Sequence, residues 1–173
     1  KTCRRFVDKE QRTKNKEQRM GSSISTPLPR LAVPTGKVRI CIAGFPISHH
    51  TGRARTIASL IAETYPETYE TWFYFDGSGF RPDFLSAVKA ELSQEQRETF
   101  KDHKTSPFCW LEKSDGTKVA LGGRDRLCEW VQGTFAADDK EKDAKLLKLC
   151  ADPPSLWEFR FDNSTPGTAK TEE

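Results

Sequence analysis

The sequence predicts an α/β protein with a mixed four-stranded sheet and the element order β-α-β-α-β-β-α, followed by an added helix and flanked by polar tails. Two apolar, strand-like segments, 37–44 and 68–76, flank a segment with helical spacing at 53–64. Two parallel strands of one sheet need a crossover of this kind. Two further strands surround Asp115-Gly116, a strong signal for a tight hairpin.

Length and composition agree with one domain and its tails. The chain has 173 residues, of which 35% are hydrophobic and 31% charged, as in a soluble protein with a modest core. The net charge is only +3, and much of the positive charge lies in residues 1–19, so we expect no nucleic-acid binding. No apolar run approaches the roughly 18–20 residues of a membrane span, so we expect no transmembrane segment.

The first half of the chain begins with a polar segment. Residues 1–36 are polar and then rich in Pro, Ser and Thr, which predicts an extended or disordered lead-in. The β-branched run 37–44 predicts a central strand and opens a domain that we expect to cover 37–135. We expect a loop over 45–52, and then a helix over 53–64 with apolar residues at helical spacing.

The middle of the chain holds a dense aromatic strand and a long helical pattern. Thr68–Asp76 is rich in aromatic residues, and Gly77-Ser78-Gly79 ends it. A single helix is predicted from near Arg81 to about Lys101, with Pro82 in its first turn, where the missing N–H costs nothing.

The last part of the chain predicts the hairpin and two helices. The hairpin strands are expected over 108–112 and 118–121, and a helix over 124–135. An appended segment, 136–161, should contain a charged helix at 138–149 that ends before Pro153-Pro154, and then an alternating stretch, 156–161, that adds an edge strand or docks on a groove. Residues 162–173 should form a disordered tail.

The five cysteines are widely spaced and include no C-x-x-C pair. They are Cys3, Cys41, Cys109, Cys128 and Cys150. This spacing matches neither a disulfide framework nor a zinc ribbon. Cys41, Cys109 and Cys128 lie in apolar patterns, so we interpret them as buried structural thiols in a reducing compartment, with a reactive thiol as the alternative.

A short motif near the amino end has two interpretations. Met20-Gly21 opens a sequence that matches an N-myristoylation signal, with Gly21 as the modified residue if Met20 is the initiator. Membrane anchoring would depend on that modification. We favour a flexible Ser-rich linker, because short motifs of this kind often match by chance.

Two separate segments carry groups that bind ligands in other proteins. Ser48-His49-His50-Thr51 precedes the first predicted helix, and Gly122-Gly123-Arg124-Asp125 begins a later one. Free N–H groups at a helix start attract an anion, and Arg124 would add positive charge. The plainer interpretation is that the two glycines let a strand turn into a helix, with Asp125 favourable in its first turn.

The histidines do not by themselves predict a metal site. His49 and His50 are adjacent, but a convincing site needs three or four ligands, and His103 is distant in sequence. A nucleophilic pair of Ser48 with a histidine lacks an evident orienting carboxylate. We therefore expect no bound metal.

Together these features resemble the thioredoxin fold, and glutaredoxins in particular. In that family a Cys-x-x-Cys or Cys-x-x-Ser motif precedes the first helix, and Ser48–Thr51 occupies this place here without sulfur. Ser106-Pro107 resembles the family's cis-proline dipeptide, whose backbone pairs with peptide or glutathione. Gly122–Asp125 resembles the turn that receives the carboxylate of the glutathione γ-glutamyl group. Thiol–disulfide exchange needs a thiolate, so the resemblance implies a site without oxidoreductase activity.

Residues 37–135 also resemble the glutaredoxin-like N-terminal domain of divergent malate dehydrogenase-like proteins of ciliated eukaryotes. The matching residues are Tyr65-Pro66, Ser106-Pro107-Phe108-Cys109-Trp110 and Leu121-Gly122-Gly123. No G-x-G-x-x-G motif follows, so we expect no dehydrogenase domain and no nicotinamide chemistry. The cysteines already favour a reducing, cytoplasmic compartment, and the resemblance adds the cilium or axoneme as a candidate.

Two functional hypotheses follow. In the first, the chain is a redox-inactive binding module that acts as a protein-binding subunit or adaptor of a larger assembly, with no cofactor. In the second, the chain binds glutathione, or is a glutathione-dependent enzyme, through Ser106, Pro107 and Gly122–Asp125. The first hypothesis makes catalysis less expected than binding.

Overall fold

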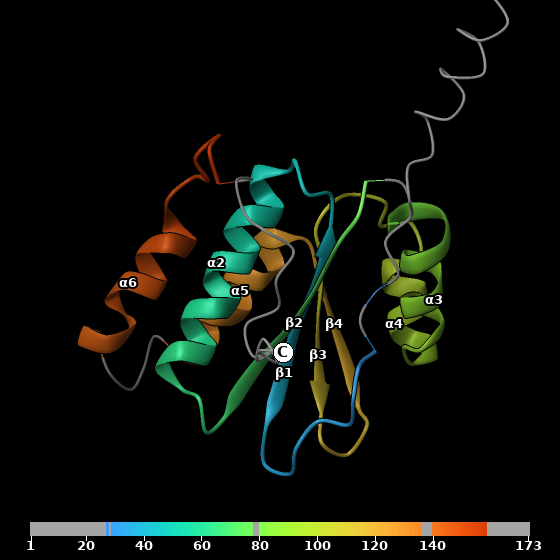
Figure 1. The fold of residues 1–173 in the computed structure, drawn as a ribbon, viewed down its shortest axis with the longest axis horizontal. Helices are drawn as coiled ribbons and strands as arrows, with labels where there is room; N and C mark the ends of the chain where they lie inside the picture. The colour runs from blue at the N-terminus through green and yellow to red at the C-terminus, as the bar shows by residue number, and fades with distance from the viewer. Residues whose placement is uncertain (1–26, 28, 78–79, 136–139, 159–173) are drawn as a thin grey trace, which may run out of the picture.

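The structure is a computed structural model that describes residue 27 and residues 29–77, 80–135 and 140–158. A four-stranded sheet forms its centre, as Figure 1 shows. Helices α2 (His49–Thr64) and α5 (Arg124–Phe135) cover one face of the sheet, and α3 (Ser86–Ala90) and α4 (Gln94–Phe100) lie on the other side. The expected α/β class and mixed sheet are therefore confirmed.

The sheet has the strand order β2-β1-β3-β4. The central strand β1 pairs in parallel with β2 and antiparallel with β3, and β3 pairs antiparallel with β4. Helix α2 connects the two parallel strands, as the crossover argument requires. The strands are β1 (Val38–Gly44), β2 (Tyr69–Phe75), β3 (Phe108–Lys113) and β4 (Lys118–Gly122).

The loop expected over 45–52 is shorter than predicted, because α2 begins at His49. Ser48 is the N-cap residue, with an extended backbone, and its Oγ accepts a hydrogen bond from the Thr51 N–H. Serine at this position satisfies one of the free N–H groups of the first turn. The polar sequence His49–Gly52 hides this helix start from a search for apolar spacing, so the prediction was wrong for residues 49–52.

The prediction of a single helix over 81–101 is also wrong. The structure divides it into a π-helical turn (Phe80–Leu85, labelled η1), α3 and α4. The break occurs at Ser93, whose extended backbone and side-chain bond to the Gln96 N–H start a new helix. Apolar residues continue across the break, so the spacing alone gave no sign of it.

The alternating stretch expected as a strand over 156–161 has a different form where the structure describes it. Residues 156–158 lie in a turn, in which the Glu158 N–H donates to the Ser155 carbonyl at 3.1 Å. Leu156 and Trp157 are exposed, at 69% and 65%. Residues 159–161 lie outside the described residues, as do Met20, Gly21 and the predicted tail over 162–173.

Each face of the sheet carries its own apolar cluster, because side chains alternate along β1. Ile40 and Ile42 face α2 and α5, while Cys41 and Ala43 face the α3 and α4 side. The second cluster is dominated by aromatic residues: Trp72, Tyr74, Phe80, Phe108 and Trp110.

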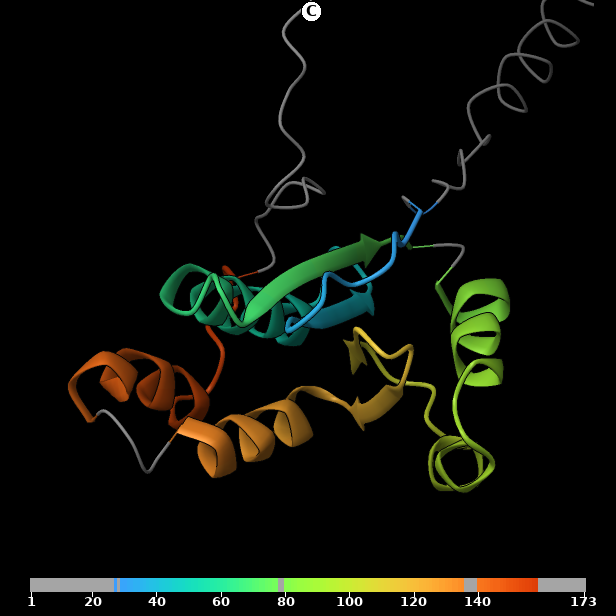
Figure 2. The ribbon, with the colours of Figure 1, turned by 90° about the horizontal axis from the view of Figure 1, so that it is seen from below.

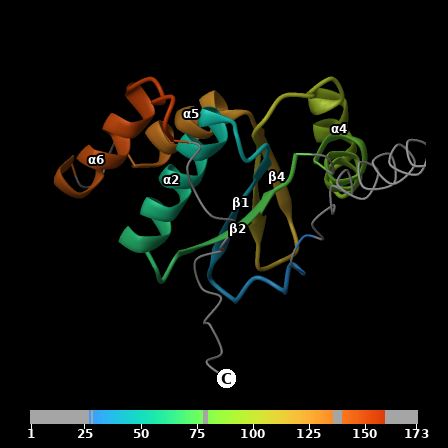
Figure 3. The same cartoon turned by 45° about the horizontal axis from the view of Figure 1, so that its top comes forward.

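Helix α6 (Lys140–Ala151) packs outside α2 and α5 (Figures 2 and 3). Its buried Asp143 accepts a hydrogen bond of 2.6 Å from the Tyr65 hydroxyl, and Leu146 belongs to the core. Arg53 of α2, which is 4% exposed, donates to the carbonyl oxygens of Leu149 and Asp152 at the end of α6. The appended helix is thus part of the packed domain.

Part of the predicted lead-in also packs on the sheet. The guanidinium of Arg30 lies 5.5 Å from the ring centroids of both Trp72 and Trp110. It pairs with Glu91 at 2.6 Å and with the buried Glu112 at 3.2 Å. The ordered contact therefore extends to at least Arg30 among the described residues, ahead of the boundary expected at residue 37.

None of the helices in the described residues is both long and apolar enough to span a membrane.

Candidate functional site

A groove of about 650 Å³ opens at the end of the sheet where β1 finishes. Three chain segments meet there because β1 and β4 both end at this edge, while the antiparallel β3 begins there. The lining comes from the start of α2, the loop before β3 and the start of α5: His50, His103, Thr105, Ser106, Pro107, Gly123, Arg124, Asp125, Arg126 and Glu129.

The loop before β3 is held by a hydrogen-bond network centred on Ser106. The Ser106–Pro107 peptide bond is cis. The Ser106 Oγ accepts from the Phe45 N–H at 2.7 Å and shares a hydrogen bond of 2.7 Å with the Thr51 hydroxyl. A Cβ at Gly44 would collide with both hydroxyl oxygens, so glycine leaves the room that this network needs.

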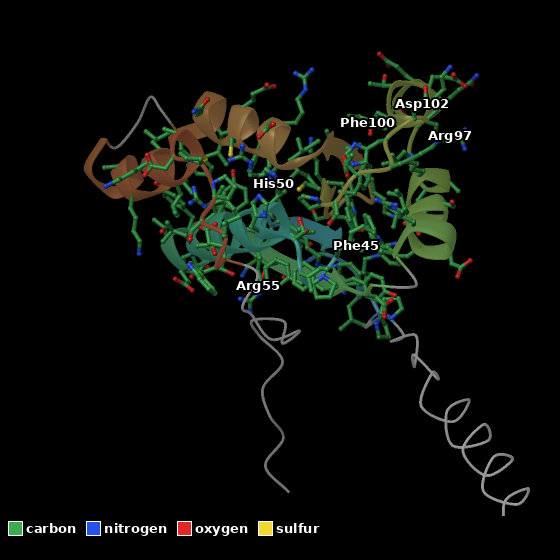
Figure 4. All side chains as sticks on the ribbon, turned by 90° about the horizontal axis from the view of Figure 1, so that it is seen from above. Phe45, His50, Arg55, Arg97, Phe100 and Asp102 are labelled. Carbon is green, nitrogen blue, oxygen red and sulfur yellow. The ribbon has the colours of Figure 1, made fainter. Side chains whose placement is uncertain are left out.

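The start of α2 contributes one groove residue and no thiol. Only His50 of the predicted Ser48–Thr51 segment lines the groove. The Ser48 Oγ serves as the helix cap, and Thr51 is buried behind the groove in its bond to Ser106. In Figure 4, His50 lies at the start of α2, near α5, and Phe100 of α4 lies toward the other side of the sheet. Neither hydroxyl is placed as an activated nucleophile.

Two histidines share the groove, although they are far apart in sequence. The His103 Nε2 lies 3.0 Å from the Thr105 carbonyl oxygen and 3.3 Å from that of Pro107. A carbonyl oxygen only accepts, so Nε2 carries the proton. Burial lowers the pKa of His103, and burial together with the neighbouring His49 lowers the pKa of His50. Both side chains are therefore neutral at pH 7.

The start of α5 forms the third wall. The preceding residue is Gly123, which has no side chain to cap the helix, and the first-turn residues Arg124, Asp125 and Arg126 face the groove. The Arg124 side chain is 16% exposed and contacts the exposed Asp125. Its Nε is buried and has no hydrogen-bond partner in the described part of the chain. This wall offers positive charge and free N–H groups to an anion.

Gly122 has a conformational role and does not line the groove. Its φ of +95° is in the left-handed region, where glycine is favoured. A Cβ there would also lie 2.8 Å from the Phe100 ring. The two glycines thus have different roles. Gly122 permits the turn from strand to helix, and Gly123 leaves the helix start without a capping side chain.

Six of the ten predicted site residues line one groove: His50, Ser106, Pro107, Gly123, Arg124 and Asp125. Ser48, His49, Thr51 and Gly122 support it from outside. The sequence prediction did not include four lining residues, His103, Thr105, Arg126 and Glu129. Position alone could have indicated Thr105, since it immediately precedes Ser106-Pro107.

The groove can pair with a backbone as well as bind an anion. In the described part of the chain no hydrogen bond occupies the backbone N–H or carbonyl of Ser106. An extended peptide could bond to both groups, as a strand does at a sheet edge. No group of three or more His, Cys, Asp or Glu side chains in the described residues is arranged to hold a metal ion.

A second cavity, of about 330 Å³, lies beside Arg30 and the β3–β4 hairpin. Four of its charged side chains already bind one another: Arg30 and Lys118 both pair with Glu91, and Arg30 also pairs with Glu112. A ligand would have to compete with these ion pairs, so the groove at the end of β1 is the stronger candidate.

No protein-family model matches the chain, and no curated protein matches it either.

Proposed function

We propose that this chain is a non-catalytic binding module with a thioredoxin-like, glutaredoxin-like fold, which holds an extended peptide segment of a partner protein in the groove. The observation that carries the proposal is the junction of the Ser106–Pro107 loop with the open start of α5, in a groove that no cysteine lines among the described residues. Such a module would act as a subunit or adaptor in a larger assembly.

The polar groups of the groove support a peptide ligand with a carboxylate. The free backbone groups of Ser106 lie on one wall and the first-turn N–H groups of α5 on another. Arg124 adds a positive charge, and its Nε has no hydrogen-bond partner within the described residues. A chain end or an acidic side chain would satisfy these donors, while the peptide backbone pairs with Ser106.

The same groove argues against thiol chemistry at the start of α2. A nucleophile there would need a thiolate or a base-activated hydroxyl. The Ser48 Oγ accepts a hydrogen bond from the Thr51 N–H, and the Thr51 hydroxyl bonds to Ser106, so both are used in structure. Binding without turnover is the function that remains.

A selected-peptide experiment tests this function. The full chain is used to select peptides from a random library that displays free carboxyl ends, and binding is measured by calorimetry and by amide chemical shifts. We expect shifts at Ser106 and at Gly123–Arg126, and a loss of affinity of about tenfold in Arg124→Ala, the effect of one charge-assisted hydrogen bond.

The matched control is Lys101→Ala, which removes an exposed charge on another element and should not change the affinity. The proposal would be contradicted if the selected peptides shift only signals outside the groove. It would also be contradicted if they bind the Arg124→Ala variant as tightly as the parent.

A second candidate is a glutathione binder, which the joint presence of Pro107 and Gly123–Asp125 in one groove favours. The helix start and Arg124 suit the glutathione carboxylate, and the exposed Asp125 suits its ammonium group. Calorimetric titration with reduced glutathione separates the candidates. Binding that is lost in Asp125→Ala and Gly123→Val would favour this one, whereas absence of heat would favour the protein-binding module.

Turnover in a glutathione-coupled disulfide reduction assay would contradict both candidates as stated, since neither provides a thiol in the groove. Gly123→Val should leave the fold intact while it narrows the groove, because a Cβ at this position meets only the His103 ring, at 3.8 Å.

A further inference from the structure

An aromatic row of side chains crosses the sheet on the face that α3 and α4 cover. In this row Cys41 of β1 lies between Trp72 of β2 and Trp110 of β3, which pair with it in the two ladders. Neighbouring strands lie about 4.8 Å apart, so the backbones of β2 and β3 are about 10 Å apart here. The centroids of the two indole rings are only 5.9 Å apart, so the rings lean toward each other over the small cysteine.

A charged row lies beside the aromatic row on the same face. It consists of Glu70, Arg39, Glu112 and Lys118, whose signs alternate across the four strands. Arg39 pairs with Glu70 at 2.6 Å and with Glu112 at 3.3 Å. Glu112 is 5% exposed, and its Oε1 accepts a hydrogen bond of 3.1 Å from the Trp110 indole N–H. Glu112 therefore connects the two rows.

Helix α3 adds a third carboxylate to this face. Glu91 is the C-cap residue of α3, where the helix dipole disfavours a negative charge unless a cation is near. Lys118 is one such cation and pairs with Glu91. The carboxylates of Glu70, Glu91 and Glu112 thus outnumber the two cations of the charged row, which leaves one negative charge to be balanced.

The lead-in supplies this balance as a guanidinium. The Arg30 Nη2 donates to both carboxylate oxygens of Glu91, at 2.7 and 2.6 Å, and Nη1 lies 3.2 Å from the Glu112 Oε1. The Arg30 guanidinium carbon is 5.5 Å from the centroids of both indole rings. A planar guanidinium can stack on aromatic rings while it binds two carboxylates, and an ammonium cannot match this geometry.

Few other described contacts hold this part of the lead-in. Leu31 is 77% exposed, and in the described part of the chain residues 30–33 make no backbone–backbone hydrogen bond. The Leu31 carbonyl accepts a hydrogen bond of 2.6 Å from Arg39. The cavity of about 330 Å³ is lined by residues 30–33 and also by Glu91 and Glu112, so a second chain has a route to both carboxylates.

We propose that Trp72, Trp110, Glu91 and Glu112 form a guanidinium site that binds an arginine side chain of a partner protein, and that Arg30 fills this site in the unbound chain. The incoming arginine displaces Arg30 and replaces its bonds one for one. Both carboxylates therefore keep a cation in the bound state, as buried charges require.

The site selects a basic, extended segment. The carbonyl that follows the incoming arginine can accept from Arg39, as the Leu31 carbonyl does in the unbound chain. This ligand has the opposite charge to the one proposed for the groove. The guanidinium site lies toward the β3–β4 hairpin, whereas the groove lies at the other end of β1, so the inference does not rest on the proposed function.

The first test empties the site in the full chain with Arg30→Ala and refills it with a small cation. Melting temperatures are compared in methylguanidinium chloride and in methylammonium chloride at equal concentration. We expect methylguanidinium to raise the melting temperature of the variant by about 1–3 °C more than methylammonium does, because only the guanidinium fits the site. In the parent, where Arg30 fills the site, the two salts should act alike.

The second test supplies the arginine on a separate chain. A peptide with the sequence of residues 27–33, blocked at both ends, is titrated into Arg30→Ala, and binding is followed by tryptophan fluorescence. The same peptide with lysine in place of its arginine should bind at least about tenfold more weakly. The parent should also bind the arginine peptide at least about tenfold more weakly than Arg30→Ala, because Arg30 competes for the site.

Two double variants locate the binding. Arg30→Ala with Glu91→Gln removes a carboxylate of the site and should lose both the peptide affinity and the methylguanidinium effect. Arg30→Ala with Glu98→Gln removes an exposed carboxylate of α4 and should keep both. Circular dichroism verifies that each variant is folded, and Arg30→Lys replaces Arg30→Ala in every measurement if the alanine variant does not fold.

The proposal is overturned if the two salts act alike on the emptied site, or if the peptide binds the parent as tightly as the variant. It is also overturned if Glu91→Gln and Glu98→Gln have the same effect. Binding at the groove is measured at Ser106 and at Gly123–Arg126, so failure of the guanidinium site and failure of the proposed function are distinguishable.

Discussion

The absence of a side chain at Gly44 allows the start of α2 to contact the loop before β3. The space beside its Cα holds the Thr51 and Ser106 hydroxyls, and a Cβ would lie 2.7 Å from the Thr51 Oγ1. Gly44→Ala should therefore push the Ser106 loop away from α2. We expect a destabilisation of about 1–3 kcal/mol, as for overpacked core sites, measured by urea denaturation.

Gly133→Ala is the matched control for this change. Gly133 lies within α5, and a Cβ there meets nothing within 4 Å. Alanine is the better helix former, so this variant should be more stable by about 0.5–1 kcal/mol. Equal destabilisation of the two variants would show that the close approach at Gly44 is not what the structure describes.

The lowered pKa of His103 predicts how stability changes with pH. The unfolded chain binds a proton near the ordinary pKa of 6.5, while burial delays protonation of the folded form to lower pH. The contribution of His103 is therefore fully present above pH 6.5 and is lost as the pH falls through the folded pKa. We expect melting temperatures to decrease from about pH 6.5 downward.

His103→Gln is the variant that tests this origin. Its amide can still donate to the Thr105 and Pro107 carbonyls but does not titrate near neutral pH. The decrease in melting temperature between pH 7 and pH 5 should be smaller in the variant than in the parent. An unchanged pH dependence would assign the effect to other groups.

At the scale of elements, α4 protects one edge of the sheet. The Gln96 Oε1 accepts a hydrogen bond of 2.8 Å from the Ala120 N–H of the edge strand β4. A free N–H there would be available to pair with another chain. Gln96→Ala should cost about 0.5–1.5 kcal/mol, the net value of one such bond. The Ala120 amide should also exchange with solvent faster, as measured by hydrogen exchange.

Gln94→Ala, on the same helix, is the control, because Gln94 is exposed and the bond to Ala120 remains intact. We expect no change in the exchange of Ala120 in this variant. Sedimentation of Gln96→Ala should further show more self-association than the control. Equal exchange in both variants would mean that α4 does not shield the strand.

Most elements could be predicted from local sequence, and the exceptions have a common cause. The bounds of α5 were predicted correctly over 124–135, because Gly123 and an apolar face mark it. The start of α2 and the break at Ser93 depend on side-chain caps, which leave the apolar spacing unchanged. The turn over 156–158 is held by local hydrogen bonds at Ser155 and by the long-range ion pair of Glu158 with Arg53, and no local pattern contains that ion pair.

Over the whole molecule, Arg30 connects the lead-in to the sheet. Its guanidinium lies over both the Trp72 and the Trp110 rings, 5.5 Å from each centroid, and pairs with Glu91 and with the buried Glu112. Arg30→Ala should lower the free energy of unfolding by about 1.5–3 kcal/mol, the usual value of hydrogen bonds to charged groups. Thermal unfolding followed by tryptophan fluorescence measures both the loss and the changed setting of Trp72 and Trp110.

Lys104→Ala is the control for Arg30→Ala, since it removes one exposed positive charge and should be neutral within about 0.5 kcal/mol. If Arg30→Ala is equally neutral, the contacts of the lead-in contribute nothing to stability, and the domain begins at residue 37 as the sequence suggested.

The candidate groove was partly predictable for a similar reason. Motifs at helix starts and before a proline indicated His50, Ser106, Pro107 and Gly123–Asp125, because such positions expose backbone groups wherever they occur. His103 could not be assigned from sequence, since its place depends on how the loop after α4 returns to β3.

The ion pair of Arg53 with Glu158 has a mechanical consequence. Arg53 lies near the start of α2, one turn from His50, and holds the chain at Glu158 by two bonds of 2.5 and 2.6 Å. A pulling force applied beyond Glu158 is therefore borne first by this pair and is passed to the helix that carries His50 into the groove. Tension on the chain would load the groove before it unfolds the sheet.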